Sequence, residues 1–283
     1  MSLQNFIKTA WIANIEESLR KSLVAASVAN TQYAGELQNL GDRVRVMQVS
    51  DPSITSYTRG ASITFEELDD AALELIADQA YSFSFKVNDV DAVQAKSQIL
   101  SKTTDKAAYG FAEKIDAYLL GLYAQAGLTS YVTGTTNWDI TSLNVEDVLL
   151  AANEKVSTAN WQKNGRFMIV PPWFTSKLVL AGLTTKTSND ELYLNGFVGR
   201  VLGWDVLESN NVSIGTSSTG ADTRILCGLR GETFSYAGVI NSIEALRLES
   251  YFSDAVKGLY VFGGKIMRPD KALCIYADKT AEA

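Results

Sequence analysis

Histidine is absent from all 283 residues of this chain. Its absence excludes a Ser-His-Asp triad, a Cys-His pair and metal sites with imidazole ligands, and it removes the usual proton shuttle near neutral pH. Catalysis by a lysine or by a pair of carboxylates stays open, because 32 acidic residues bring some pair close together in any fold. A carboxylate-based enzyme or a binding module is therefore one hypothesis. The alternative is that these acids form an ordinary solvated surface.

Cysteine, proline and long apolar runs are also scarce. Cys227 and Cys274 each lie inside an apolar segment, so we expect two buried thiols. Only four prolines and a mean hydropathy of zero argue against long disordered tails. No run approaches the roughly 18 apolar residues of a membrane span, and no apolar block at the amino terminus is long enough for a signal peptide. We therefore expect a soluble intracellular protein with no membrane partner.

Positive charge is in short supply as well. The chain has 25 Lys and Arg against 32 Asp and Glu, which gives a net charge of −7. Nucleic-acid binding driven by phosphate neutralisation needs clustered Lys and Arg, and no such cluster occurs. This balance argues against a protein that binds DNA or RNA irrespective of sequence.

Glycine is clustered, but neither cluster has the spacing of a phosphate-binding loop. Residues 196–203 (GFVGRVLG) do not fit G-x-G-x-x-G, and a strand rather than a helix is predicted to follow them. In residues 258–266 (GLYVFGGKI) the lysine of a P-loop comes one residue late, and isoleucine stands where Ser or Thr is required. We interpret the first cluster as a tight turn that leads into a strand at Trp204. We predict no catalytic residue, cofactor or metal.

The first half of the chain alternates helical and extended patterns. An apolar residue recurs every four positions over 7–23, which predicts an amphipathic helix. Residues 42–49 and 81–87 alternate apolar and polar side chains and are predicted to be strands. We interpret these two strands as a two-stranded arm, which is marginally stable alone and needs a surface to lie against. Residues 88–127 are predicted to form a long helix.

The second half is predicted to contain shorter elements. Five apolar residues recur at helical spacing in 144–159, namely Val145, Val148, Leu149, Ala152 and Val156. Residues 166–170 (RFMIV) are apolar on both faces and are predicted to form a buried strand, and 171–182 a helix with proline at its start. Further strands are predicted at 203–212, 223–228, 243–250, 258–267 and 272–277.

Taken in this order, the elements resemble the major capsid proteins of tailed bacteriophages, which share the fold of icosahedral heads. The resemblance also rests on the amino-acid sequence of four stretches: 41–70 (GDRVRVMQVSDPSITSYTRG to ITFEELDD), 76–95 (IADQAYSFSFKVNDVDAVQA), 195–212 (NGFVGRVLGWDVLESNNV) and 247–273 (RLESYFSDAVKGLYVFGGKIMRPDKAL). The similarity spans residues 6–277, and its specificity lies in the collinear order of these stretches.

The resemblance implies an α+β capsid fold in five parts. These are an N-terminal arm at 1–34, an extended β-hairpin loop at 35–87, a spine helix with the peripheral domain at 88–143, an axial domain at 144–245, and C-terminal strands returning to the peripheral domain at 246–283. The resemblance starts close to the first residue, so we expect no cleaved scaffolding segment and infer a separate scaffolding protein.

The implied function is structural. Copies of the chain would form hexamers and pentamers of a shell that encloses double-stranded phage DNA without reading its sequence, with a portal and, in some heads, decoration proteins as further partners. The protein would reside in the virion, and in the host cytoplasm during assembly. An encapsulin-type shell, which shares the fold and packages an enzyme, is the nearest alternative. The candidate subunit contacts are charged residues around the extended loop: Arg43, Arg45, Arg59, Glu66, Glu67 and Asp70.

Overall fold

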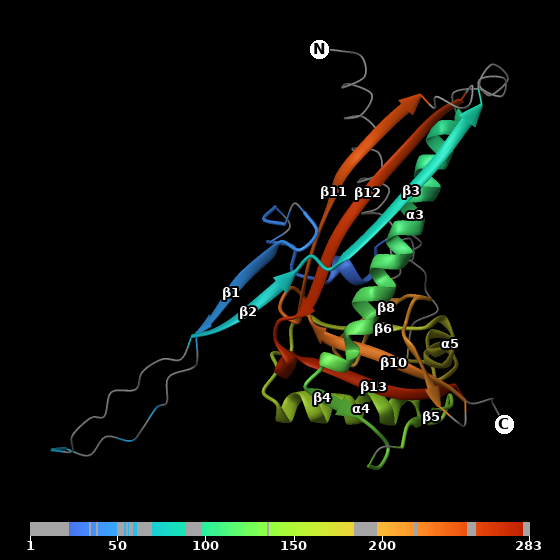
Figure 1. The fold of residues 1–283 in the computed structure, drawn as a ribbon. Helices are drawn as coiled ribbons and strands as arrows, with labels where there is room; N and C mark the ends of the chain where they lie inside the picture. The colour runs from blue at the N-terminus through green and yellow to red at the C-terminus, as the bar shows by residue number, and fades with distance from the viewer. Residues whose placement is uncertain are drawn as a thin grey trace.

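The structure, a computed structural model, describes residues 23–49, 54, 56, 59–60, 70–88, 98–183, 197–247 and 253–279, apart from 34, 38, 135, 218 and 219. The helix predicted over 7–23 lies almost wholly outside these ranges. A lower part built on a large sheet carries an elongated upper sheet, and a narrow β ribbon projects from their junction (Figure 1). No helix in the described ranges is long and apolar enough to cross a membrane.

The lower part is an eight-stranded mixed sheet flanked by two helices. Its strands follow the order β4 (Leu128–Ser130), β13 (Ala272–Lys279), β10 (Gly220–Leu229), β6 (Arg166–Val170), β8 (Trp204–Glu208) and β7 (Phe197–Val201), with β5 (Trp138–Ile140) also pairing with β13 and β9 (Ile214–Ser217) with β10. The helices are α4 (Val145–Thr158) and α5 (Pro172–Leu180). Strands from both ends of the chain's second half therefore meet in one sheet.

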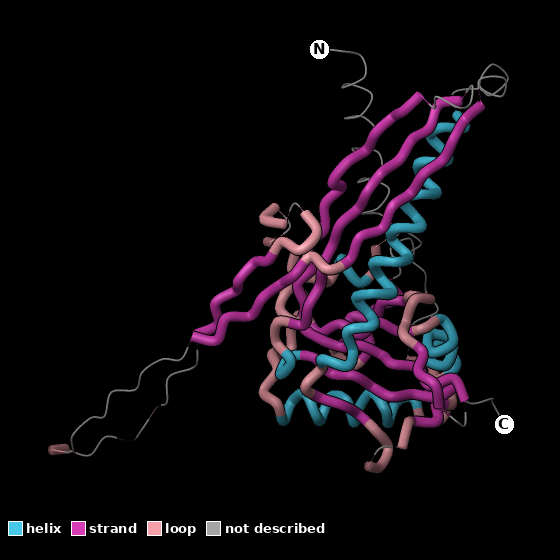
Figure 2. The backbone as a smooth tube through the Cα atoms, viewed as in Figure 1, coloured by secondary structure: helices cyan, strands magenta, loops and turns pink. Residues whose placement is uncertain are grey.

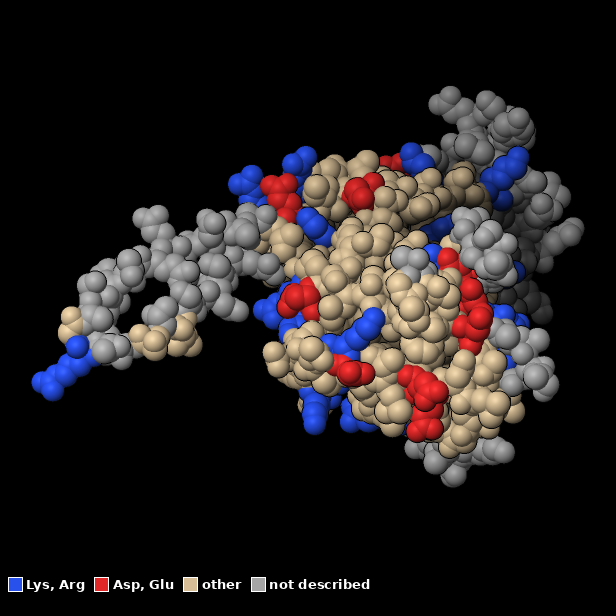
Figure 3. Space-filling view, turned by 90° about the horizontal axis from the view of Figure 1, so that it is seen from below, with Lys and Arg blue, Asp and Glu red and all other residues tan. Residues whose placement is uncertain are grey.

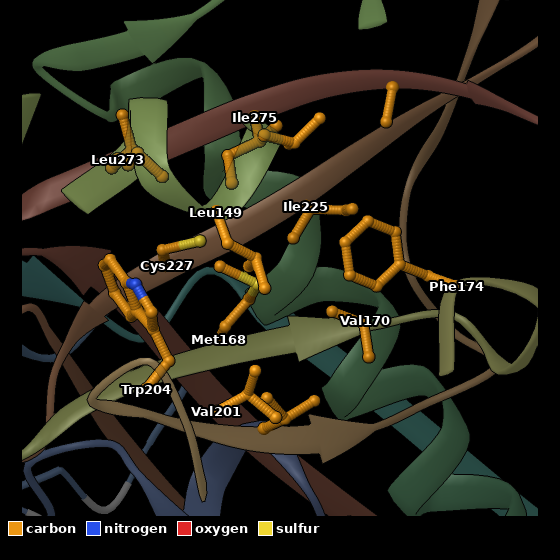
Figure 4. Close-up of a cluster of buried hydrophobic side chains, with 14 of the residues drawn as sticks. Leu149, Met168, Val170, Phe174, Val201, Trp204, Ile225, Cys227, Leu273 and Ile275 are labelled. Atoms are coloured by element: carbon orange, nitrogen blue, oxygen red, sulfur yellow. The ribbon is translucent and has the colours of Figure 1, made fainter. Parts of the chain in front are cut away.

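The core of the lower part confirms the predicted patterns. The five apolar residues of α4 are fully buried, and every residue of the predicted strand β6 is buried. Leu149 of α4 and Met168 of β6 point toward one another, with Trp204 from β8 in the same cluster (Figure 4). Each large apolar side chain buried in this way stabilises the fold by roughly 1.5–3 kcal/mol.

Both cysteines belong to the sheet. Cys227 lies in β10 and Cys274 in the neighbouring strand β13, and both are buried free thiols, as predicted. Burial raises the pKa of Cys274 to about 12. Neither thiol is therefore in a reactive thiolate form near neutral pH.

The upper part is a three-stranded antiparallel sheet in the order β11 (Phe234–Arg247), β12 (Ser253–Ile266) and β3 (Gln79–Asn88). The long helix α3 (Gln98–Gly121) covers one face of this sheet (Figure 1). Phe111 of α3 packs against the rings of Phe83 and Tyr260, at centroid distances of 5.6 and 5.5 Å. Aromatic contacts of this kind join three segments that are far apart in the sequence.

The long helix is shorter than predicted. Asn88, where the helical pattern was predicted to begin, is the last residue of β3, and residues 89–97 lie outside the described ranges. At its far end α3 stops at Gly121 and continues as the 3₁₀ turn η2 (Leu122–Gln125). The helix therefore ends before Gly127, where its end was predicted, and the 3₁₀ turn fills most of the interval.

The projecting ribbon consists of β1 (Arg43–Val49) and β2 (Asp70–Ile76), paired antiparallel (Figure 2). The predicted pairing of 42–49 with 81–87 is wrong, because the second segment lies in β3 and pairs with β12. The physical reason is burial: Tyr81 and Phe83 need apolar neighbours, which the sheet and α3 supply and an exposed ribbon does not.

Glycines in β12 permit close packing and do not form a phosphate loop. A Cβ built on Gly258 would overlap the ring of Phe83, and one built on Gly263 would overlap the carbonyl of Ile76. The residues that resemble a P-loop in the sequence therefore lie inside an extended strand, against side chain and backbone of other elements.

The other glycine cluster forms a tight turn that leads into a strand at Trp204, as predicted, and the structure adds a preceding strand, so that the turn belongs to a β-hairpin. β7 and β8 pair antiparallel, and the turn between them places Leu202 at φ 48° and Gly203 at φ 88°. Two consecutive positive φ angles are typical of the type I′ turn of two-residue hairpins. A strand rather than a helix follows the cluster, so no helix N-terminus is available there to hold a pyrophosphate.

Candidate subunit-contact surfaces

The ribbon β1–β2 carries two of the predicted contact residues. Arg45 lies directly opposite Glu74 in the ladder and binds it with Nε 3.1 Å from Oε1, while Arg43 Nη1 lies 3.3 Å from Oε2 of the same carboxylate. The two arginine side chains are 62% and 73% exposed. Exposed pairs contribute about 0–1 kcal/mol, so they select the register of the ribbon more than they stabilise it.

The other predicted contact residues are less closely placed. Arg59 is exposed in a turn with Gly60, whose φ is 91°. Asp70 is the first residue of β2, opposite Val49. Glu66 and Glu67 lie outside the described residues. The structure thus brings together Arg43 and Arg45 among the predicted six residues.

Glu74 is the ribbon residue that the sequence analysis missed. It lies between Leu73 and Leu75, and Leu75 is fully buried while Glu74 faces the two arginines. The alternation Leu-Glu-Leu is the period-two pattern of a half-buried strand and was the signal available in the sequence.

The root of the ribbon is fixed to the face of the upper sheet opposite α3. Val44, Leu75 and Ala77 form a buried cluster with Ala237 and Val261 of the sheet. The Lys265 ammonium also donates to the carbonyl of Glu74 at 3.2 Å. Beyond this root the ribbon leaves the body of the molecule (Figure 2). A packed root with a projecting end is suited to reach a neighbouring molecule.

The upper part of that same sheet face is polar. Ser82, Ser84 and Lys86 of β3 are exposed, and Lys257 of β12 forms a 2.8 Å ion pair with Glu244 of β11. These side chains alternate with the aromatic residues that face α3. In the described residues, the upper sheet therefore has one face covered by the helix α3 and one polar face that is exposed in its upper part.

A buried carboxylate fixes residues 23–30 to the body. Asp116 of α3 accepts hydrogen bonds from the backbone N–H groups of Val24 at 3.0 Å and Ala25 at 3.1 Å, at the start of the 3₁₀ turn η1 (Ala25–Ser27). Burial raises the pKa of Asp116 to about 6, against these hydrogen bonds, which lower it. Further along, Asn30 pairs with Ser235 at the base of β11. The start of the described chain is therefore anchored at both ends of this segment.

The lower surface has exposed apolar side chains beside α4. A shallow groove of about 710 Å³ is lined by residues of α4 and of 127–138, among them Val132 and Trp138. Leu143, at 92%, and Leu150, at 48%, are also exposed nearby on and before α4. Seen from below, acidic and basic side chains are interspersed between uncharged surface, with no broad field of one sign on the visible face (Figure 3). This surface is suited to protein contact more than to binding a polyanion.

Within the described ranges, no group of three or more Cys, Asp or Glu converges in a way that could hold a metal ion. The most buried acidic residues have structural partners instead. Asp222 pairs with Arg224 and accepts a 2.7 Å hydrogen bond from the amide of Asn137, and Asp116 holds the backbone of η1. The carboxylates of Asp222 and Asp116 therefore stabilise the fold through contacts within the chain.

Comparison with known proteins identifies the family. No curated protein matches the chain. The family model described as "Phage capsid protein" matches residues 48–275. A solved structure of Mycobacterium phage Che8 is 25% identical, with a TM-score of 0.68 and coverage of 89% of this chain and 90% of that one.

Two further structures share the fold at lower identity. The capsid structure of the cyanophage P-SCSP1u is 16% identical, with a TM-score of 0.66 and coverage of 90% of this chain and 87% of that one. The SrpI encapsulin complex from Synechococcus elongatus is 14% identical, with a TM-score of 0.60 and coverage of 87% and 86%. These two likenesses show the α+β capsid fold alone, whereas the family model distinguishes phage capsids. The chain belongs to the phage capsid protein family, and it is a structural protein of a phage capsid shell.

Proposed function

We propose that copies of this chain assemble into hexamers and pentamers, which together form the icosahedral shell around a double-stranded phage genome. The observation that carries the proposal is the ribbon β1–β2, whose root is packed on the body and whose far end leaves it. A two-stranded ribbon is marginally stable alone, so it gains most from a neighbour to lie against. Membership of a capsid family makes that neighbour another copy of the chain.

The five segments expected from the sequence give each part of the fold a role. Residues 1–34 are the N-terminal arm and 35–87 the extended loop that contains the ribbon. Segment 88–143 carries the spine helix α3 of the peripheral domain, and 144–245 forms most of the eight-stranded sheet, which gathers around the local symmetry axis. The C-terminal segment supplies β12 to the upper sheet and β13 to the lower one.

The charged residues of the extended loop are proposed subunit contacts. Arg43, Arg45 and Arg59 are exposed in the structure, and Glu66, Glu67 and Asp70 form an acidic stretch in the sequence. The open face of the upper sheet carries Lys86 and Lys257, which are of opposite charge to that acidic stretch. Exposed ion pairs of this kind fix the register of a contact and add little affinity.

The remaining partners follow from a container role. A net charge of −7 fits a shell that encloses DNA without binding it tightly or by sequence. Assembly takes place in the host cytoplasm with a separate scaffolding protein, a portal supplies the entry for DNA, and decoration proteins bind the finished shell. The role is structural and needs no enzymatic activity of this chain.

Electron microscopy of the purified protein tests the assembly proposal. The sharpest variant replaces residues 50–69 by Asn-Gly, because Val49 and Asp70 are directly opposite and a two-residue type I′ turn can join them. We expect the full chain to form rings or shells and the shortened chain to remain a folded, unassembled subunit by circular dichroism and sedimentation. The contradicting result is a full-length chain that stays monomeric, alone and with the product of the upstream gene.

The content of the particles decides between a phage head and an encapsulin-type compartment. The fold likeness to SrpI encapsulin does not separate these two functions. Particles purified from the natural source are expected to contain double-stranded DNA. A co-purifying enzyme inside particles free of DNA would favour the compartment.

A further inference from the structure

The first described residues of the chain are fixed to the body at two places, and one of these is an ionisable side chain. Asp116 of α3 is 2% exposed, and each of its carboxylate oxygens accepts one backbone N–H, Oδ2 from Val24 at 3.0 Å and Oδ1 from Ala25 at 3.1 Å. These N–H groups lie at the start of the turn η1, where a helical turn leaves donors without partners of its own. The hydrogen bonds at this end therefore depend on one carboxyl group.

The second attachment consists of main-chain hydrogen bonds. The carbonyl of Val28 accepts from the N–H of Gly231 at 2.8 Å, and Asn30 exchanges two 2.9 Å hydrogen bonds with Phe234 and Tyr236 at the base of β11. Backbone N–H and C=O groups keep the same hydrogen-bonding capacity whatever the charge of nearby side chains. Val28 is therefore a fixed point about which the preceding turn can move.

The turn between the two attachments has small side chains. Ala25 and Val28 are buried, and Ala26 and Ala29 are partly buried against the same core cluster. Stabilisation by burial is roughly proportional to the apolar area removed from water, so alanine contributes little. Segments with few buried apolar contacts open locally while the rest of the molecule stays folded. The turn at 24–27 therefore has little apolar area to hold it closed.

We propose that residues 24–27 form a proton-dependent latch, which closes over a protonated Asp116 and opens about Val28 when this carboxyl group is ionised. The physical basis is the cost of keeping a charged carboxylate out of water, which the closed turn imposes and an open turn relieves. The latch is a property of the single subunit. In the shell proposed above it also determines when the N-terminal arm that precedes Val28 can change direction, and only this consequence rests on the proposed assembly.

The described residues that face Asp116 from the packed elements bring no positive charge to it. Tyr236 of β11 lies close enough that its pKa is raised by burial, by Tyr260 of β12 and, to a smaller extent, by the charge of Asp116, so Tyr236 stays neutral in this pH range. The two tyrosine hydroxyls share a 2.5 Å hydrogen bond. The turn η1 consists of two alanines and a serine. The carboxylate is therefore met by backbone N–H groups, which offset part of the cost of its burial.

The flanking charges on α3 are directed to solvent. Glu113 and Lys114 are exposed, whereas Asp116 on the same helix is buried. Arg20 and Lys21 precede the turn in the sequence and lie outside the described residues. The measurement is therefore made on the full chain, which retains both of these basic residues.

The sign and size of the effect follow from proton binding. Burial raises the pKa of Asp116 from 3.8 to about 6 in the closed state, against the backbone hydrogen bonds, which lower it. A hydrated carboxyl group in the open state titrates near its ordinary value, so the closed state binds the proton more tightly. Opening therefore becomes more favourable as pH rises from about 4 to 7, and the effect levels off above that range. Between pH 5 and 7.5 the ratio of open to closed latch rises about ten-fold.

Residue-resolved hydrogen exchange of the unassembled full-length subunit tests the latch. The amide of Ala25 reports the attachment to Asp116, and the amide of Asn30 reports the main-chain attachment in the same molecule. Exchange rates are divided by the intrinsic rate at each pH. We then expect opening at Ala25 to increase about ten-fold from pH 5 to 7.5, and opening at Asn30 to change less than about two-fold.

Two variants separate the carboxylate of Asp116 from other effects of pH. Asp116→Asn cannot ionise, so its opening at Ala25 should vary less than about two-fold over this range, whatever its absolute level. Glu113→Gln removes an exposed carboxylate from the same helix and should keep the ten-fold rise of the natural chain.

The proposal is overturned if opening at Ala25 in the natural chain is independent of pH or falls as pH rises, and also if the rise persists in Asp116→Asn. An equal rise at Asn30 overturns it as well, because a larger part of the subunit would then open together with the turn. The exchange measurement requires no particle. A subunit that never assembles therefore refutes the assembly proposal and has no bearing on the latch.

Discussion

The buried carboxylate of Asp116 makes the stability of the unassembled subunit depend on pH in a way that can be calculated. The pKa of this group rises from its ordinary value of 3.8 to about 6, chiefly because burial disfavours the charged form. One pKa unit corresponds to about 1.4 kcal/mol, so ionising Asp116 costs the folded subunit about 3 kcal/mol relative to the unfolded chain.

The sign follows from proton binding. Between pH 4 and 6 the folded state holds the Asp116 proton and the unfolded state releases it, so the contribution of this group to stability falls as pH rises. It is fully present below about pH 4 and lost above about pH 6. Other carboxylates contribute their own slopes, so only a difference between two proteins isolates this one.

The perturbation is Asp116→Asn, which cannot ionise. It leaves an amide N–H₂ opposite one of the two N–H donors of Val24 and Ala25, at a cost of about 1–3 kcal/mol that does not vary with pH. The free energy of unfolding of the variant minus that of the natural chain should therefore rise by about 2.4 kcal/mol from pH 4 to pH 7, which is most of the full effect. Urea unfolding of unassembled subunits at half-unit pH intervals measures it.

Glu113→Gln is the matched control, because it removes an exposed carboxylate from the same helix. The reasoning is refuted if the difference between Asp116→Asn and the natural chain stays constant within about 0.5 kcal/mol across this range, or if it falls as pH rises. Either result would mean that Asp116 ionises in the folded subunit as easily as in the unfolded chain.

Three further substitutions test the packing. Gly263→Ala should destabilise the subunit by more than about 3 kcal/mol in urea unfolding, because the added Cβ would overlap the Ile76 backbone. Its control is Gly110→Ala, which adds a Cβ in open space on α3 and should stabilise the subunit by about 0.5–1 kcal/mol. Equal effects of the two substitutions would contradict the close approach at Gly263. Trp204→Ala should cost about 3–5 kcal/mol through the cavity it leaves, and a cost below about 1 kcal/mol would argue against full burial. Leu202→Asn should raise the midpoint of thermal unfolding by a few degrees. Asparagine adopts the positive φ of this turn position at a cost about 1 kcal/mol lower than leucine does. A lower midpoint in the variant would contradict the assigned turn type.

Sequence reasoning located most single elements because their periodicity reflects local burial. The apolar spacing of Val145, Leu149 and Val156 predicted α4, and all three are fully buried. The uniformly apolar strand β6 was recognised because both faces of a central strand are covered. The glycines before Trp204 were correctly interpreted as a turn, because their spacing and the following strand excluded a phosphate loop.

Pairing across the chain could not be predicted in the same way. The partner of β1 was wrong because alternation marks a strand and does not say which edge it joins. The carboxylate of Glu74 was missed as the shared partner of two arginines, since that contact depends on the same register. The burial of Asp116 depends on residues 24–26, which lie 90 or more positions away in the sequence.

The sequence by itself determined the absence of histidine chemistry, the α+β content, the amphipathic helices and the order of elements by which the capsid family is recognised. These properties depend on composition and on periodicities of 3.6 and 2 residues, which are local. Only the tertiary structure decided that β3 leaves the ribbon to join β12, and that glycines in β12 admit Phe83 and the Ile76 carbonyl. It also decided that Asn30 pairs with Ser235 at the base of β11. Such choices depend on shape and register between distant segments, because backbone hydrogen bonding is the same for every strand and only packing selects the partner.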